Sequence, residues 1–148
     1  MNKLEPRLAS CLRAISTLDE ILNVPFSVIV RDAAIQRFEY SFESLWKLLK
    51  TYLDVQEGVI CNSSKRCFRE ALKVELLTVR ETETCLKMTD DCNLTSHTYL
   101  EPVAEAIYGK LSAYLEVMKH LLTNIQNRAT QFESQEGSFE TIQKRRKK

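Results

Sequence analysis

Glycine and proline are scarce in this chain of 148 residues, which contains only three of each. A β-rich domain needs many more of both, because they supply the backbone conformations of tight turns. The scarcity also excludes a glycine-rich phosphate-binding loop, and no Gly-x-Ser-x-Gly sequence is present. Hydrophobic residues make up 44% of the chain, which is enough for one domain with a substantial core. The composition therefore predicts a single all-helical domain.

The chain has almost no excess charge of either sign, since its formal net charge is +1. This balance depends on residues 144–148, which are all basic; the rest of the chain carries 16 basic and 20 acidic residues. A negatively charged body does not favour broad capture of nucleic acid, whose affinity rises with the number of phosphates neutralised. We expect one helical domain over residues 1–128 and a polar, basic, flexible tail over residues 129–148. The tail is interpreted as a solvated terminus, with binding of RNA or an acidic partner as the alternative.

Cysteines and histidines do not form the pattern of a structural zinc site. The chain contains five cysteines, an odd number without a Cys-x-x-Cys pair, and only two histidines. We therefore expect a reduced, cytoplasmic chain that needs no metal and no other cofactor. No segment approaches the roughly 20 apolar residues that cross a membrane, and the first residues lack the apolar run of a signal peptide. The sequence predicts no membrane association.

Apolar residues recur along most of the chain at spacings of three and four, which is the period of an amphipathic helix. Asn23-Val24-Pro25 interrupts this pattern once, and Gly58 interrupts it again. The expected helices cover residues 4–22, the stretch from Ser27 to Gly58, a short segment capped by Ser63 or Ser64, residues 82–91, and residues 101–125 as one last helix. The sequence contains no repeat and no useful strand-like alternation. We predict an all-α, antiparallel, up-and-down bundle of four or five helices.

Residues 91–99 form the densest group of functional side chains, and they lie between two apolar-periodic segments. His97 can act as a base or an acid near neutral pH, and Tyr99 follows it by two residues. The alternative is a loop histidine that only hydrogen-bonds the following helix. The other histidine, His120, lies among apolar positions of the last helix and is interpreted as structural or solvated.

The residues around this segment do not favour metal binding or cysteine chemistry. Asp90, Asp91 and His97 carry ligand atoms for a hard metal, but adjacent carboxylates on a helix point about 100° apart. Cys92 follows two acidic residues, which would raise its thiol pKa and make it a poor nucleophile. We interpret Cys92 as a small filler.

Residues 31–40 carry polar side chains beside the apolar seam of the longest helix. These side chains are Arg31, Asp32, Gln36, Arg37 and Glu39. One interpretation is a solvent-exposed face with salt bridges. The other is a polar surface that lines the segment around His97 or forms a subunit contact.

Together these stretches resemble the HEPN superfamily, in particular its branch of nucleotidyltransferase substrate-binding proteins. The similarity extends from the first helix to about Asn127. It rests on Arg31-Asp32, Ile35-Gln36-Arg37-Phe38-Glu39, Trp46-Lys47-Leu48-Leu49-Lys50, Phe68-Arg69-Glu70-Ala71 and Asn93-Leu94-Thr95-Ser96-His97-Thr98-Tyr99. The resemblance implies a homodimeric helical bundle that works with a small, separately encoded nucleotidyltransferase of the MNT type, in several cases as toxin and antitoxin.

The resemblance also implies roles for the residues around His97. In active members, an arginine, four intervening residues and a histidine form a metal-independent ribonuclease site. Cys92 occupies the arginine position here, while Asn93 and His97 keep the rest of the motif. Losing one such charge-stabilising group commonly costs roughly 10²–10³ in rate. In related pairs the tyrosine two residues after the histidine receives AMP from the partner, which makes Tyr99 the candidate acceptor.

Three hypotheses follow for the function. The first is a partner or substrate-binding subunit of a minimal nucleotidyltransferase, with a degraded ribonuclease motif and Tyr99 as AMP acceptor. The second is an active ribonuclease toxin that uses His97 and an arginine from elsewhere, either Arg37 or Arg69, with RNA as substrate. The third is a non-catalytic, dimeric interaction protein in which the polar segment serves the subunit contact.

Overall fold

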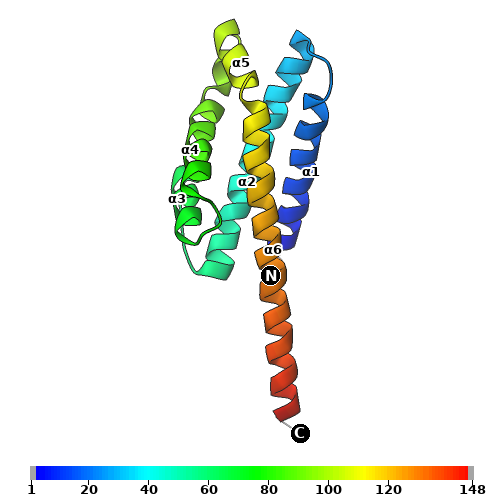
Figure 1. The fold of residues 1–148 in the computed structure, drawn as a ribbon, viewed down its shortest axis with the longest axis vertical. Helices are drawn as coiled ribbons and strands as arrows, with labels where there is room; N and C mark the ends of the chain where they lie inside the picture. Colours follow the sequence, from blue (N-terminus) through cyan, green and yellow to red (C-terminus); the bar gives the residue numbers. More distant parts are fainter. Residues whose placement is uncertain (1–2, 147–148) are drawn as a thin grey trace.

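The computed structural model describes the backbone of residues 3–146 and the side chains of residues 3–130. Its helices are α1 (Leu4–Leu22), α2 (Val28–Glu57), α3 (Ser64–Lys73), α4 (Val79–Asn93), the short 3-10 helix η1 (Thr95–His97), α5 (Glu101–Tyr108) and α6 (Leu111–Arg146). The described part of the chain contains no strand. Figure 1 shows long helices lying side by side, with α5 at one end of the bundle. The expected all-α bundle is confirmed, but the described part of the chain forms six α-helices instead of the expected four or five.

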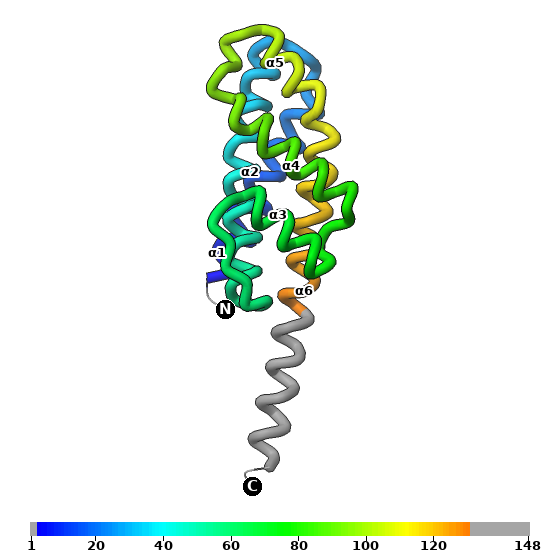
Figure 2. The backbone as a smooth tube through the Cα atoms, turned by 90° about the vertical axis from the view of Figure 1, so that its left-hand side faces the viewer, coloured from blue at the N-terminus to red at the C-terminus, as the bar shows by residue number. Residues whose placement is uncertain are grey.

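Helix α2 is the centre of the bundle, because it packs against each of the other five α-helices. The Ser27 side chain caps its start by accepting a hydrogen bond from the Val30 amide at 3.0 Å. At its end Gly58 adopts a left-handed φ of 66°, which a residue without a Cβ adopts at little cost. Both predicted ends are therefore confirmed. Figure 2 shows α3 and α4 covering one side of this central helix.

Stacked and tilted aromatic rings join three helices in the core. Phe38 of α2 stacks on Tyr114 of α6, with ring centroids 5.7 Å apart. Phe42 of α2 contacts Phe68 of α3 at 6.1 Å. All four side chains are buried, so removing any of them would leave a cavity in a densely packed interior.

The expected single helix over residues 101–125 is two helices. α5 ends at Tyr108 and α6 begins at Leu111, with Gly109 and Lys110 between them. Glycine is a poor helix former, since its backbone loses more entropy on ordering than that of any other residue. The break escaped detection because Ile107 and Leu111, on either side of it, are both buried and keep the helical spacing.

The expectation of a fully reduced chain is wrong. Cys61 and Cys67 form a disulfide, with Cα atoms 5.5 Å apart. Ser63 caps α3 by accepting a hydrogen bond from the Arg66 amide at 3.3 Å, and Cys67 lies in the first turn of this helix. The two cysteines are six positions apart in the sequence, a spacing that carries no recognised motif. The other three cysteines, Cys11, Cys85 and Cys92, are free.

Two further expectations concern the chain as a whole. Among the described residues, no helix combines the length and the apolar content that crossing a membrane requires. Helix α6 continues to Arg146, but side chains are described only to Thr130. The expected flexible tail over residues 129–148 therefore lies almost entirely outside the described side chains and stays a prediction.

Candidate functional site

The turn that carries His97 is built by hydroxyl and backbone hydrogen bonds rather than by an irregular loop. Helix α4 ends at Asn93, and the Thr95 hydroxyl donates a hydrogen bond to the Cys92 carbonyl oxygen at 2.7 Å. The Thr98 hydroxyl donates to the Thr95 carbonyl oxygen at 3.1 Å. The His97 amide donates to the Leu94 carbonyl oxygen at 2.9 Å, which closes η1. The two threonines therefore fix the backbone that presents His97.

His97 and Tyr99 are both exposed on this turn. Tyr99 is 76% exposed, and the two rings meet edge to face with centroids 6.1 Å apart. Within the described residues, neither the imidazole nor the phenol has a hydrogen-bond partner. Both functional groups are thus free to meet a molecule that approaches from solvent.

Cys92 lies one helical turn before η1, half-buried against the core. Burial raises the pKa of its thiol to about 12, and the carboxylates of Glu43 and Glu39 on α2 add to the effect. The predicted rise in the pKa of the Cys92 thiol is found. The charges that contribute to it belong to α2 and not to the two aspartates that precede Cys92. Cys92 therefore stays a neutral thiol, and it supplies no positive charge beside His97.

The two aspartates before Cys92 bind other partners. Asp90 forms an ion pair with Lys65 of α3 at 2.6 Å. Asp91 is buried, binds the Lys110 ammonium at 3.1 Å and accepts a hydrogen bond from the Tyr114 hydroxyl. Burial, together with this bond to Asp91, raises the pKa of Tyr114. In the described part of the chain, no three His, Cys, Asp or Glu side chains converge as metal ligands.

Arg31 is the buried cation at this end of the bundle. Its Nη1 and Nη2 atoms lie 2.7 and 3.2 Å from the two carboxylate oxygens of Glu101, the first residue of α5. Its Nε lies 3.1 Å from Asp32. Hydrogen bonding to Glu101 raises the pKa of Arg31 and lowers the pKa of Glu101. Arg31 and Asp32 thus help to fix the segment that follows Tyr99.

Of the remaining polar residues in the 31–40 stretch, Glu39 acts on Cys92, whereas no contact joins Gln36 or Arg37 to the His97 turn. Arg37 Nη1 donates a hydrogen bond to the Thr17 carbonyl oxygen of α1 at 2.8 Å, so its guanidinium is directed at α1. Gln36 is exposed on α2. Arg69, the other cation considered as a replacement, is exposed on α3. His120 contacts Glu81 of α4, as expected of a structural histidine.

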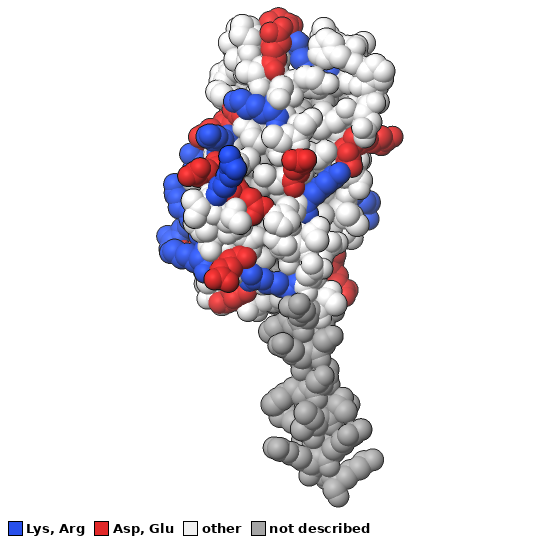
Figure 3. Space-filling view, viewed as in Figure 1, with Lys and Arg blue, Asp and Glu red and all other residues white. Residues whose placement is uncertain are grey.

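The sequence prediction missed several exposed apolar residues at the same end of the bundle. Phe26, Val28 and Ile29 are 63%, 51% and 82% exposed, and Leu100 is 48% exposed. The sequence does mark these residues, because Val28 and Ile29 are adjacent apolar residues that lie before Ile35, where the apolar period of the helix begins. Figure 3 shows one acidic cluster with basic atoms beside it at the end that carries α5, surrounded by uncharged atoms, and more acidic and basic side chains lower on this face.

The helical bundle has the fold of several solved structures, some of which are toxin–antitoxin proteins. A tri-AMPylated HEPN toxin from Shewanella oneidensis, solved in complex with an MNT antitoxin, matches with a TM-score of 0.69 and 17% identity over 84% of this chain and 96% of the matched chain. A protein from Haemophilus influenzae also matches, and its structure is described as revealing the fold of a substrate binding domain of a nucleotidyltransferase. The TM-score is 0.59, with 24% identity over 84% of this chain and 98% of that one. At these identities the likeness shows the fold alone.

Closer similarity defines the family. The model of the family described as nucleotidyltransferase substrate binding protein like matches residues 6–127. This chain therefore belongs to that family, as the resemblance of its motifs predicted. A protein from Thermus thermophilus is 43% identical, with a TM-score of 0.76, over 78% of this chain and 98% of that one. No curated protein sequence matches the chain significantly.

Proposed function

We propose that this chain is the helical partner of a small, separately encoded nucleotidyltransferase, and that Tyr99 is the hydroxyl to which this partner attaches AMP. The observation that carries the proposal is the exposed phenol of Tyr99, which is 76% exposed beside the His97 ring. The family description and the tri-AMPylated toxin from Shewanella oneidensis both support it.

The transfer is a nucleophilic substitution at phosphorus. The Tyr99 Oη atom attacks the α-phosphorus of ATP, a phosphorus–oxygen bond forms, and the bond to the bridging oxygen breaks to release pyrophosphate. A neutral phenol is a weak nucleophile, so a base must accept its proton. The partner enzyme would supply this base, and a metal bound there would make the ATP phosphorus more electrophilic. The hydrogen bonds of Thr95 and Thr98 keep the acceptor turn rigid.

The chain itself is proposed to be a poor ribonuclease. His97 can move a proton of the ribose 2′-hydroxyl or of the leaving oxygen, but the charged phosphorane also needs a fixed cation. Cys92 is a neutral thiol at the position where a cation is needed, and Arg31 is already paired with Glu101 and Asp32. The site therefore keeps the proton-transfer group and lacks the group that stabilises charge.

We also propose that two copies of the chain pair through the exposed apolar surface formed by Phe26, Val28 and Ile29. These three side chains are each more than half exposed, and covering them in a second copy would remove apolar surface from water. They come from the α1–α2 connection and the first turn of α2, and none of them belongs to the turn that carries His97 and Tyr99.

Light scattering of the purified chain, alone and with a small nucleotidyltransferase from the same genome, tests the partner role and the pairing. We expect a dimer alone and a larger complex with the enzyme. Ile29→Asp should produce a monomer, whereas Val79→Asp, which changes an exposed valine at the start of α4, should not. A natural protein that is monomeric at micromolar concentration contradicts the pairing, and a mixture that elutes as two separate proteins contradicts the partner role.

A further inference from the structure

A groove lies between the start of α1, the second half of α2 and the loop that follows α2. Its volume is about 860 Å³, and its lining includes Lys3, Arg7, Trp46, Lys50 and Cys61. The volume falls within the roughly 300–1,000 Å³ that is usual for small-molecule sites. In Figure 1 the start of α1 and the α5 end lie at opposite ends of the bundle, so the groove is separate from the His97 turn.

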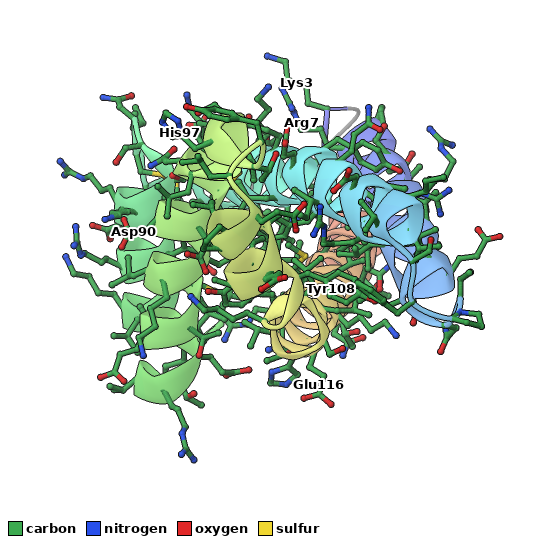
Figure 4. All side chains as sticks on the ribbon, turned by 90° about the horizontal axis from the view of Figure 1, so that it is seen from above. Lys3, Arg7, Asp90, His97, Tyr108 and Glu116 are labelled. Atoms are coloured by element: carbon green, nitrogen blue, oxygen red, sulfur yellow. A yellow bond between two sulfur atoms is a disulfide. The ribbon has the colours of Figure 1, made fainter. Side chains whose placement is uncertain are left out.

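Four cations from two helices that are distant in sequence line this groove. Lys3 and Arg7 come from the start of α1, and Lys47 and Lys50 come from α2. Figure 4 shows Lys3 and Arg7 on the side of the bundle away from Glu116. Asp54 is the one acidic residue in the lining. This local excess of positive charge contrasts with the negative balance of the body and favours an anionic ligand.

Three of the four cations are available for such a ligand. Lys47 pairs with Glu43 at 3.6 Å. Among residues 3–130, no carboxylate lies within ion-pair distance of Lys3, Arg7 or Lys50. An arginine can donate two parallel hydrogen bonds to a phosphate, and a lysine ammonium supplies a compact charge. The three groups together suit a ligand with several phosphate oxygens.

An aromatic ring lies beside these charges. Trp46 lines the groove, and its Nε1 donates a hydrogen bond to Glu43 at 3.2 Å, which fixes the ring. The Lys50 ammonium lies 6.0 Å from the ring centroid, at the limit of a cation–π contact. The flat indole face can stack on a planar base, an interaction worth about 1–3 kcal/mol per base.

The far wall of the groove is also held in place. Cys61 in this wall is bonded to Cys67, and the Val59 amide donates a hydrogen bond to the Leu53 carbonyl oxygen at 2.9 Å. A preformed wall lowers the entropy cost of binding, because the loop does not have to be ordered by the ligand.

We infer that this groove binds a free nucleoside polyphosphate, with the phosphates at Arg7 and Lys50 and the base against the Trp46 ring. The inference goes beyond the proposed partner role, since the groove contains neither His97 nor Tyr99. A single phosphate would leave most of the groove unfilled, whereas a nucleotide uses both the charges and the ring.

Fluorescence of Trp46 tests this inference directly, because it is the only tryptophan in the chain. The purified full chain is titrated with ATP, inorganic triphosphate, adenosine and a single-stranded oligonucleotide. We expect saturable quenching by ATP, and we expect triphosphate and adenosine each to bind at least tenfold more weakly than ATP. The double variant Arg7→Gln/Lys50→Gln should weaken ATP binding at least tenfold, and circular dichroism should show an unchanged fold.

Two control variants show whether the loss of binding is specific to this groove. Lys87→Gln changes an exposed lysine of α4 that does not line the groove, and Tyr99→Phe changes the proposed acceptor. Both should bind ATP as the natural chain does. The inference is overturned by the absence of saturable quenching, by triphosphate binding as tightly as ATP, by an oligonucleotide binding more tightly than ATP, or by equal weakening in either control.

Discussion

Arg31 binds both carboxylate oxygens of Glu101 across 70 residues of sequence, at 2.7 and 3.2 Å. The guanidinium is buried, whereas the carboxylate is largely exposed. This pair joins the first turns of α2 to the first residue of α5, and that residue follows Tyr99 by two positions. The proposed acceptor turn is therefore fixed at its far end by an ion pair and at its near end by the hydroxyl groups of Thr95 and Thr98.

The Arg31–Glu101 pair should make stability depend on pH in the acid range. Hydrogen bonding to Arg31 lowers the pKa of Glu101, so its contribution is complete above the ordinary glutamate pKa of about 4.3 and is lost as the pH falls through the lowered value. Glu101→Gln should lower Tm at neutral pH, and the difference from the natural protein should shrink below about pH 4.

Thermal unfolding followed between neutral and strongly acidic pH measures this effect. Glu105→Gln is the matched control, since Glu105 is exposed one turn later on α5. It should change Tm little at any pH. A Tm difference for Glu101→Gln that is the same at every pH would show that the ion pair is not its cause.

The Cys61–Cys67 disulfide should stabilise the chain by about 2 kcal/mol, the value expected from loop-closure entropy for so short a loop. Urea unfolding of the oxidised chain is compared with the Cys61→Ser/Cys67→Ser variant. The variant should be less stable by that amount and should not respond to a reducing agent. Addition of the reducing agent should bring the natural chain down to the stability of the variant; a natural chain that does not respond contradicts the bond.

Cys92 should react slowly with alkylating agents despite being half-exposed. Burial raises its thiol pKa to about 12, so the reactive thiolate forms only in strongly alkaline solution. At pH 8 we expect labelling by iodoacetamide roughly 10²–10³-fold slower than for an ordinary thiol, measured by peptide mass spectrometry. Labelling as fast as that of a small thiol would show that Cys92 is ionised near neutral pH and would contradict its interpretation as a neutral filler.

Cys92→Arg should restore part of a ribonuclease site, because it places a cation five residues before His97. We expect very slow cleavage of RNA by the natural chain, cleavage by Cys92→Arg that is roughly 10²–10³-fold faster, and loss of that gain on adding His97→Ala. Cleavage by the natural chain that depends on His97 would instead identify an active enzyme.

The spacing of apolar residues and the residues that begin and end helices allowed most of the bundle to be predicted from the sequence. The apolar spacing of three and four predicted α1 and α2, and Ser27 and Gly58 predicted the ends of α2. The break at Gly109 was not predicted, because Ile107 and Leu111 keep the spacing across it. The spacing of apolar residues indicates which face of a helix is buried, but it does not indicate whether the helix is continuous between those residues.

The sequence could not supply the contacts that depend on the three-dimensional arrangement of the chain. The family motif identified Cys92, His97 and Tyr99 as positions of interest, and the structure places His97 and Tyr99 together on one exposed turn. The pairing of Arg31 with Glu101 and that of Cys61 with Cys67 depend on tertiary geometry, and no local pattern marks either one. The same reason explains why Arg37, which lies in the same polar stretch as Arg31, is directed at α1 instead.

Tyr99 is proposed to accept AMP from a nucleotidyltransferase partner. The most direct measurement incubates the chain with that enzyme, ATP and magnesium, and maps the adduct by peptide mass spectrometry. Tyr40→Phe is the matched control, because Tyr40 is also exposed but donates or accepts a hydrogen bond with Thr17. We predict AMP on Tyr99 in the natural chain and in Tyr40→Phe, and none at that position or elsewhere in Tyr99→Phe. An unmodified natural chain, or equal modification of Tyr99→Phe, would contradict the claim.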